Sequence, residues 1–372
     1  MTTLTKSTVR LFASSKSWIE GEAVHQLNAT AQLEGMTLAV GFPDLHPGKY
    51  TANGAAFVSE GVIYPHLIGT DIGCGMALFA TDLPRRKAKV DAWSKLQFQL
   101  EHPWDGDVNS ALAAAELDST DFDNSFGTLG GGNHFAEVQA VEEIVDANEF
   151  HRVGVEKEAL VVLVHSGSRG LGEATLRTYV DEHHGSGVDA DSFAANEYLR
   201  DHDGAVRWAK ANRQLLAQRF LQTLGAEGEC VWDNCHNSIT RYGDTWIHRK
   251  GAVTSEGEFV VIPGSRGALT YVVKPIGDGA THAWSLAHGA GRKWSRSASR
   301  ARMRERFTVQ ELTQTPLGGR VICEQRELLY EEAPTAYKNI EVVINDMVEA
   351  GLISVIATFR PLLTYKTRVQ RR

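Results

Sequence analysis

Residues 159–167 read ALVVLVHSG, a continuous apolar run that ends in a histidine and a glycine. An apolar run of this length, bounded by turn-forming residues, is typical of a buried strand. Residues 172–224 then carry apolar side chains at three-to-four spacing, with aspartates before the main run and a glycine at its end, which predicts helical structure. Together the two stretches predict a mixed α and β fold.

The rest of the chain extends this pattern. Residues 36–82 alternate short apolar runs with Gly, Pro and Asp turns, which predicts strands, and residues 244–274 return to short strands. The spacing in residues 86–117 and 292–307 favours helices, and residues 338–363 predict a helix followed by an apolar strand.

Composition limits the classes of protein that fit. The chain has 372 residues, of which 42% are hydrophobic and 23% charged, as in soluble globular proteins. No apolar run approaches the roughly 20 residues that span a bilayer, and the start MTTLTKSTVRLF lacks the apolar core of a signal peptide. We therefore expect a cytoplasmic protein without membrane contact. With only four cysteines the chain has no disulfide framework, so metal or thiolate chemistry is expected of them.

Charge gives no overall attraction to nucleic acid, because 38 basic residues face 46 acidic ones and the net charge is -8. Two local clusters are basic. Residues 292–307 hold seven Lys or Arg and one Glu, and residues 365–372 hold four Lys or Arg. Each is either a solvated face or a nucleic-acid contact.

Of six short stretches, four combine glycine with His, Cys or Asp, while CHNSITR (235–241) has Cys and His without glycine and VIPGSRGALTY (261–271) has glycine without them. Glycine lets the backbone approach a ligand closely, and consecutive free N–H groups can bind an anion, so the combination suggests a metal beside phosphate. The stretches are TDIGCGM (70–76), GTLGGGNHFAE (127–137), VLVHSGSRGLG (162–172), CHNSITR (235–241), VIPGSRGALTY (261–271) and LAHGAGR (286–292).

Five residues of these stretches form a candidate ligand set, namely Asp71, Cys74, His134, His165 and His236. Oxygen, sulfur and imidazole together suit a borderline transition metal. The residues lie too far apart in sequence for a zinc finger, so a fold must gather them from loops. They would hold one metal ion, or two if the sulfur bridges them, and two-metal sites are typical of enzymes that act on phosphates.

The order and spacing of these motifs resemble the RtcB family of RNA-splicing and repair ligases. The resemblance implies one large α+β domain over residues 1–372, with layered sheets around a central metal cleft and helices outside. It implies a manganese-dependent enzyme that uses GTP to form a covalent histidine guanylate. The GMP then passes to an RNA 3′-phosphate, often derived from a 2′,3′-cyclic phosphate, and a 5′-hydroxyl displaces it. The motifs run through FPDLHPGK (42–49), TDIGCGM, GGGNHFAE, HSGSRG, HNSITR, HRKGAV (248–253), IPGSRG, HGAGR and RPLLTYK (360–366).

The resemblance also assigns roles by position. His288 is implied as the nucleophile, and Cys74 as the ligand shared by two Mn²⁺ ions, with Asp71, His134, His165 and His236 completing their coordination. Contacts to GTP or GMP are implied for Asn133, His134, Glu137, Gly264, Ser265, Thr270, His288, Gly289, Ala290, Gly291 and Lys366. Candidates for RNA or triphosphate phosphates are Arg169, Arg249 and Lys250.

Simpler interpretations stand beside these roles. Cys74 could be a small buried apolar residue, Glu137 a solvated helix residue, and Lys366 part of a basic tail. His46 is expected to orient a ligand by a hydrogen bond, and Cys235 is either a spare thiol or a neighbour of the metal site.

Three features depart from the family pattern. Arg266 makes PGSRG of the usual PGSMG, Thr270 stands where serine is common, and the chain continues past Lys366 as TRVQRR. We expect a divergent, somewhat short paralogue. Arg266 either strengthens phosphate binding or obstructs it.

Two other functions stay open at this point. A two-metal site alone would serve a phosphoesterase or cyclic phosphodiesterase that acts on RNA ends, and the 292–307 cluster would serve a non-catalytic RNA-binding protein. The sequence does not identify the RNA. It leaves the need for an archease-type activator open, and a monomer is the default expectation.

Overall fold

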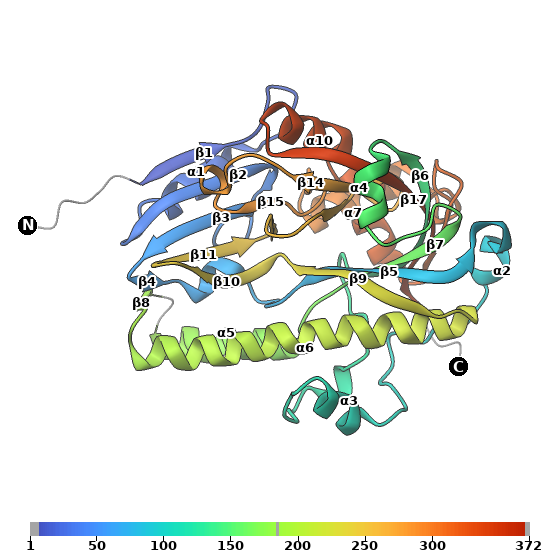
Figure 1. The fold of residues 1–372 in the computed structure, drawn as a ribbon, viewed down its shortest axis with the longest axis horizontal. Helices are drawn as coiled ribbons and strands as arrows, with labels where there is room; N and C mark the ends of the chain where they lie inside the picture. Colours follow the sequence, from blue (N-terminus) through green and yellow to red (C-terminus); the bar gives the residue numbers. More distant parts are fainter. Residues whose placement is uncertain (1–6, 184–185, 369–372) are drawn as a thin grey trace, which may run out of the picture.

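The computed structural model describes residues 7–183 and 186–368. Two large sheets lie side by side, and long helices run along one face of the second (Figure 1). The mixed α and β class is therefore confirmed. Among the described residues, no helix combines the length and the apolar character needed to cross a membrane.

Each large sheet has a defined strand order. The first sheet has the order β1 (Thr8–Leu11), β2 (Met36–His46), β3 (Asn53–Glu60), β11 (Thr245–Lys250) and β10 (Asn237–Tyr242). The second has the order β13 (Val260–Pro263), β14 (Thr270–Pro275), β17 (Ile353–Thr367), β6 (Phe135–Ile144), β7 (Ala159–Ser166), β5 (Gly75–Pro84) and β9 (Gly228–Cys235), with β16 (Arg320–Cys323) also paired to β17. Two short sheets pair β12 (Ala252–Thr254) with β15 (Ser285–Ala287), and β4 (Val62–Ile63) with β8 (Val188–Asp189).

The predicted buried strand is β7, which pairs with β5 on one side and β6 on the other. Leu160 to Val164 are at most 1% exposed. Because both faces of β7 are covered, the strand is apolar at every position rather than at alternate ones.

The helices are α1 (Gly21–Thr30), α2 (Val90–Trp93), α3 (Val108–Ala114), α4 (Ala147–Arg152), α5 (Gly170–His183), α6 (Phe193–Leu224), α7 (Arg296–Arg306), α8 (Val309–Thr313), α9 (Arg326–Glu331) and α10 (Ile340–Glu349). The predicted helical region 172–224 is thus two helices, α5 and α6, separated by the short strand β8. The predicted helix in 292–307 is α7, and the helix and strand in 338–363 are α10 and β17.

The helix α6 packs lengthwise on one face of the second sheet (Figure 1). Leu216, Phe220 and Leu221 belong to one apolar cluster with residues of β5, β6 and β7. Ser192 caps the start by accepting from the N–H of Ala195, and Gly225 ends the helix in the left-handed conformation. A helix held in this way is a rigid support for the loops at the strand ends above it.

The predicted helical structure in 86–117 is wrong for most of that stretch. Only α2 and α3 are helical there. Phe98 and Leu100 are buried in the same cluster as α6, on a segment without regular structure. Tertiary packing of these apolar residues outweighs the helical spacing, and Pro103 and Gly106 interrupt it further.

A second core joins the two sheets. Val40 and Phe42 of β2 belong to one apolar cluster with Val260 of β13 and Ile344 of α10. The chain passes from the second sheet to the first at residue 236, between β9 and β10. Several strands of the second sheet therefore end where the two sheets meet.

Candidate metal centre and nucleotide pocket

Four neighbouring strands each supply one candidate ligand at the same edge of the sheet. The order β6, β7, β5, β9 places there His134 just before β6, His165 in β7, Cys74 just before β5 and His236 just after β9. The register brings these positions together, since His165 pairs with Phe135 and with Met76, and Gly75 pairs with Cys235. Residues as far apart in the sequence as Cys74 and His236 thus become neighbours through strand pairing.

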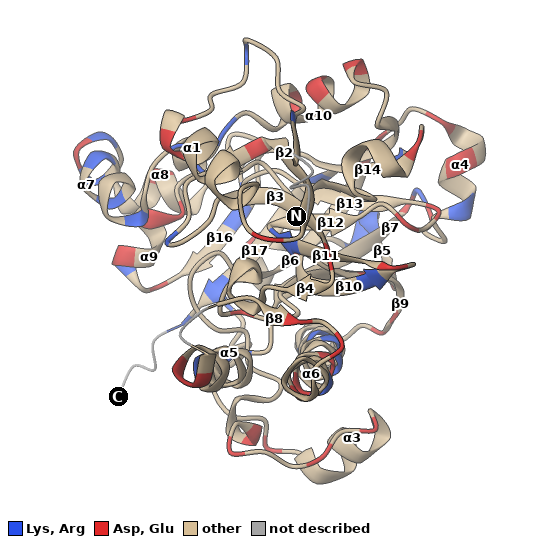
Figure 2. Cartoon of the chain, turned by 90° about the vertical axis from the view of Figure 1, so that its left-hand side faces the viewer, with Lys and Arg blue, Asp and Glu red and all other residues tan. Residues whose placement is uncertain are grey.

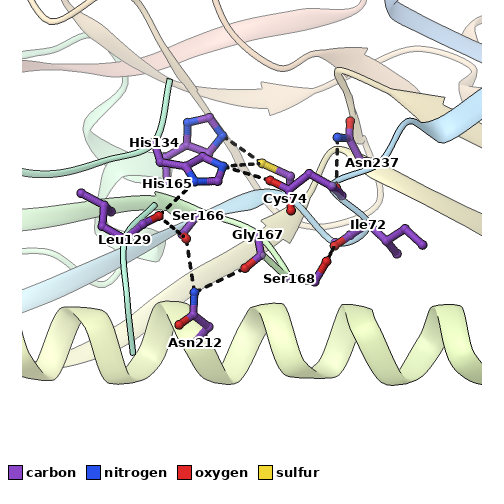
Figure 3. Close-up of polar contacts among 12 residues, drawn as sticks. Ile72, Cys74, Leu129, His134, His165, Ser166, Gly167, Ser168, Asn212 and Asn237 are labelled. Carbon is purple, nitrogen blue, oxygen red and sulfur yellow. Dashed lines mark hydrogen bonds and ion pairs between the residues drawn. The ribbon is translucent and has the colours of Figure 1, made fainter. Parts of the chain in front are cut away.

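The ligand atoms converge on the thiol (Figure 3). Cys74 Sγ lies 3.4 Å from His134 Nε2 and 3.3 Å from His165 Nε2. His165 Nε2 lies 3.1 Å from His236 Nε2, and Asp71 Oδ2 lies 3.0 Å from His134 Nε2. Two groups of three therefore form, both containing Cys74: one with Asp71 and His134, the other with His165 and His236.

The chemistry of these donors fits a divalent cation. Burial lowers the pKa of His165 and of His236 well below the usual value, so both rings are neutral and carry a free lone pair. Burial raises the pKa of Asp71, but the interactions with His134, Cys74 and Arg169 together outweigh this, and the pKa lies below its usual value. Asp71 Oδ1 has no hydrogen-bond partner among the described residues. A buried, unpartnered carboxylate oxygen beside three imidazoles and a thiol is what a metal ion would satisfy.

The helix α6 holds the ligand loops through two buried polar residues. Asn212 accepts from the N–H of Gly127 and donates to Ser166 Oγ and to the carbonyls of Thr128 and Gly167 (Figure 3). These contacts join the loop before His134 to the loop after His165.

Arg213 joins two further loops. Its Nη1 donates to the carbonyls of Gly73, at 2.8 Å, and Ser166, at 2.9 Å, while Nε and Nη2 pair with Asp233 at 2.9 and 2.6 Å. Gly73 has φ +71°, and a Cβ there would lie 2.9 Å from the Cα of Val206. The cysteine loop therefore packs directly on α6. Sequence reasoning missed Asn212 and Arg213, since nothing in a helical run marks which polar residue faces inward.

His288 lies beside this centre, with its ring centroid 4.6 Å from that of His236. Its Nδ1 lies 2.7 Å from Asp44 Oδ2, and the Asp44 side chain is fully buried. A carboxylate only accepts, so Nδ1 carries the hydrogen and Nε2 keeps a lone pair. Asp44 was not singled out from the sequence, although it stands in FPDLHPGK, one of the motifs that carry the resemblance.

A cavity of about 1100 Å³ connects the metal centre with His288. Its lining includes nearly all the residues expected to contact nucleotide or phosphate: Asn133, Glu137, Arg169, Lys250, Gly264, Ser265, Gly289, Ala290, Gly291 and Lys366. Two expected residues lie elsewhere. Arg249 is buried with its donors on Ser285, Thr240 and Trp284, and Thr270 accepts from Gln139 behind Glu137.

Glu137 and Lys366 lie deep in this cavity, 3% and 4% exposed. Both simpler interpretations are therefore wrong, because Glu137 is in strand β6 and Lys366 in strand β17. Burial raises the pKa of Glu137 to about 7, against the opposing effect of hydrogen bonds from Thr364 and Gln139. Lys366 Nζ donates to the carbonyl of His134 at 3.0 Å, and burial lowers its pKa.

Arg266 also lines the cavity and is 8% exposed. Its Nη2 donates to the carbonyl of Leu329 at 2.9 Å, while Nε and Nη1 have no hydrogen-bond partner among the described residues. Burial lowers its pKa, whereas the charges of Glu332 and Glu137 act in the opposite direction. Arg266, which departs from the family pattern, is thus close to Glu137, the candidate contact for guanine.

Four further polar residues have defined contacts. Asp233 pairs with Arg213, and His248 Nε2 accepts the N–H of Tyr64 at 2.9 Å. His46 Nδ1 bonds the backbone oxygen of Asp44 at 2.8 Å, so it supports the residue that bonds His288 rather than a metal ligand. Cys235 pairs in register with Gly75, beside the metal centre.

The two basic clusters differ from each other. In α7, Arg300 and Arg304 both pair with Glu327 of α9, so acidic residues lie beside the basic ones (Figure 2). In the tail, Tyr365 and Lys366 are buried in β17, and residues 369–372 of the TRVQRR segment lie outside the described residues.

Comparison with known proteins agrees with this geometry. The family described as tRNA-splicing ligase RtcB matches residues 26–126 and 105–367. The chain belongs to the RtcB family. One RtcB relative, RNA-splicing ligase RtcB2 of Escherichia coli strain ATCC 25922, is 44% identical over 363 residues, covering 95% of this chain and 94% of the relative.

More distant RtcB relatives align over nearly the same span. RNA-splicing ligase RtcB of Escherichia coli K12 is 28% identical, and the alignment covers 94% of this chain and 95% of that protein. tRNA-splicing ligase RtcB of Thermococcus kodakarensis is 27% identical, covering 92% and 90%. The span matched by the family, residues 26–367, contains every candidate site residue.

Proposed function

We propose that this chain is an RNA ligase that joins an RNA 3′-phosphate, or a 2′,3′-cyclic phosphate after its opening, to a 5′-hydroxyl at the expense of GTP. The observation that carries the proposal is the His288–Asp44 pair beside a metal centre whose two ligand groups share Cys74. The names of the relatives, which are RNA-splicing ligases, support the same activity.

His288 is the nucleophile in this scheme. Asp44 holds the hydrogen on Nδ1, so the lone pair on Nε2 attacks the α-phosphorus of GTP. A nitrogen–phosphorus bond forms, the bond between the α-phosphorus and its bridging oxygen breaks, and pyrophosphate leaves. An oxygen of the RNA 3′-phosphate then takes the GMP from the histidine, and the 5′-hydroxyl attacks the 3′-phosphate and releases GMP.

Glu137 supplies the guanine contact. An ionised carboxylate accepts from the N1–H and N2–H₂ donors of guanine, and this side chain lies in the cavity that also contains His288. Asn133 lines the cavity nearby. Lys366 keeps the loop of His134 in place through its hydrogen bond to that backbone, which couples the nucleotide pocket to the metal ligands.

Asp71, Cys74, His134, His165 and His236 would hold two Mn²⁺ ions, and Cys74 belongs to both groups of donors. Bound manganese supplies positive charge against the phosphate oxygens. Around it, Arg169 and Lys250 line the same cavity as cations for phosphate groups. Burial lowers the pKa of Lys250 to about 8, and its Nζ donates to the carbonyl of Thr51.

The test is covalent guanylylation. Purified protein incubated with Mn²⁺ and GTP is expected to gain one GMP per chain by intact mass spectrometry, and His288→Ala is expected to gain none. His25→Ala, which removes an exposed histidine on α1, is the matched control and should behave as wild type. Absence of the adduct in wild type would refute the mechanism. Cleavage of a cyclic phosphate without GTP that survives in His288→Ala would instead support a phosphoesterase.

A further inference from the structure

A second cavity of about 330 Å³ lies beside the first. Trp294 lines both, so the two cavities are adjacent. The second is lined by Lys16, Ser17, Trp18, Lys293, Trp294, Lys338, Asn339, Val342 and Val343. Three of these residues are lysines, two are tryptophans, and none of the described lining residues is acidic.

Trp18 is the unusual member of this lining. It is 57% exposed, so much of its indole is accessible to a ligand at the cavity. The other indole, that of Trp294, has the guanidinium of Arg302 at 4.8 Å from its ring centroid. The second cavity is thus lined by one exposed tryptophan, Trp18, and by a second, Trp294, whose ring has a guanidinium beside it.

The wall of the cavity is fixed by the fold. Ser14 donates its N–H to Asp346 Oδ2 at 2.8 Å, and the Ser17 hydroxyl donates to the same oxygen, so the segment that carries Trp18 is fastened to α10. Lys338 Nζ donates to the carbonyls of Pro43 and Leu45, which anchors the start of α10 to β2. Asp346 is therefore committed to the segment.

We propose that this hollow, the Trp18 pocket, holds an unpaired nucleotide of the RNA strand whose 3′-phosphate reacts at His288. The proposal rests on the proposed function. Indole faces stack on any base and lysines attract the backbone, which is how proteins bind single-stranded nucleic acid without reading its sequence. A protein partner fits less well, because two lysines, Lys16 and Lys293, lie beside the small apolar floor of Val342 and Val343, whereas Lys338 is committed to backbone carbonyls.

The position agrees with the order of the reaction. Trp294 follows His288 by six residues, and both line the active-site cavity. The 3′-phosphate must reach the histidine to accept GMP, so the nucleotides that precede it must leave along a neighbouring surface. The Trp18 pocket is the neighbouring hollow that offers both stacking faces and cations.

The test is RNA affinity measured without GTP, so that no sealing occurs. A fluorescent single-stranded oligoribonucleotide with a 3′-phosphate is titrated with Mn²⁺-loaded protein and followed by anisotropy. Loss of one stacked base costs about 1–3 kcal/mol, so Trp18→Ala should raise the Kd about 5- to 150-fold. Trp18→Phe, which keeps an aromatic face, should recover most of the affinity.

Two further variants sharpen the result. Lys16→Gln should reduce the slope of log K against log salt concentration by about 0.7. Phe193→Ala removes another aromatic, 76% exposed and at the start of α6, and should leave the affinity unchanged. Guanylylation of His288 by GTP should be normal in all of them.

The outcomes separate the two hypotheses. Unchanged RNA affinity in Trp18→Ala would overturn the proposal that the Trp18 pocket binds RNA and would favour a protein partner at this surface. The ligase proposal would not be affected. An equal loss of affinity in Trp18→Phe and Trp18→Ala, without recovery, also counts against stacking. Absence of guanylylation in the wild type would refute the proposed function instead.

Discussion

Arg213 allows a direct test of how the fold positions the metal ligands. Its guanidinium is fully buried, pairs with Asp233, and donates to the two carbonyls next to Cys74 and His165 in the chain. Arg213→Met keeps much of the volume but leaves the carboxylate and both carbonyls without their donor. Breaking a buried ion pair costs about 3–5 kcal/mol, and loss of a support behind metal ligands lowers metal affinity about 10- to 100-fold. We expect both effects.

Two measurements separate these effects. Urea unfolding in a chelator reports the stability of the metal-free protein, and competition with a chelator of known affinity reports the Kd for Mn²⁺. Arg207→Met, an exposed arginine on the same helix, is the control and should change neither. A folded Arg213→Met protein that binds Mn²⁺ with wild-type affinity would refute the reasoning, since α6 would then stabilise the fold without positioning the ligands.

Three further predictions concern the cavity. Cys74→Ala removes a donor from both ligand groups, so metal content by mass spectrometry should fall, and full occupancy would contradict the shared role. Burial raises the pKa of Glu137 to about 7, so below that pH its carboxylate is protonated in the GTP-free protein. GTP affinity should therefore fall by up to about tenfold for each pH unit below 7 and stay level above pH 7. Glu137→Gln should lose that dependence, and a parallel pH curve in the variant would exclude Glu137 as its origin. Arg266→Met removes a buried cation with two unpartnered donors, so the melting temperature without nucleotide should rise and the further rise on adding GTP should shrink. An undiminished rise with GTP would mean that Arg266 does not contact the nucleotide.

Much of the site could be predicted because its chemistry is local in the sequence. Four of the five candidate ligands stand near glycines in a short stretch, and a strand such as 159–167 is recognisable from its apolar run. The supports could not be predicted in the same way. Asn212 and Arg213 lie in an amphipathic helix, and only the packing of α6 on the sheet shows that they face the ligand loops.

The errors in the fold have a similar origin. Residues 86–117 have helical spacing, but Phe98 and Leu100 pack into the core on a segment without regular structure. The family resemblance implied Arg249 as a phosphate contact from its position in HRKGAV (248–253). In the structure three neighbouring oxygens take up its donors. Local pattern cannot distinguish a cation that faces a cavity from one that crosslinks two strands.

The contribution of one ligand by each of four paired strands has a consequence for biosynthesis. The ligands extend from residue 71 to residue 236, and neither group of three is complete before the strands that flank its members have paired. Such long-range contacts form slowly, because a large loop must close first. A chain emerging from the ribosome therefore has no complete site until residue 236 is free and the sheet is assembled. Metal loading then follows folding, and a bound ion stabilises only chains that have reached the native pairing.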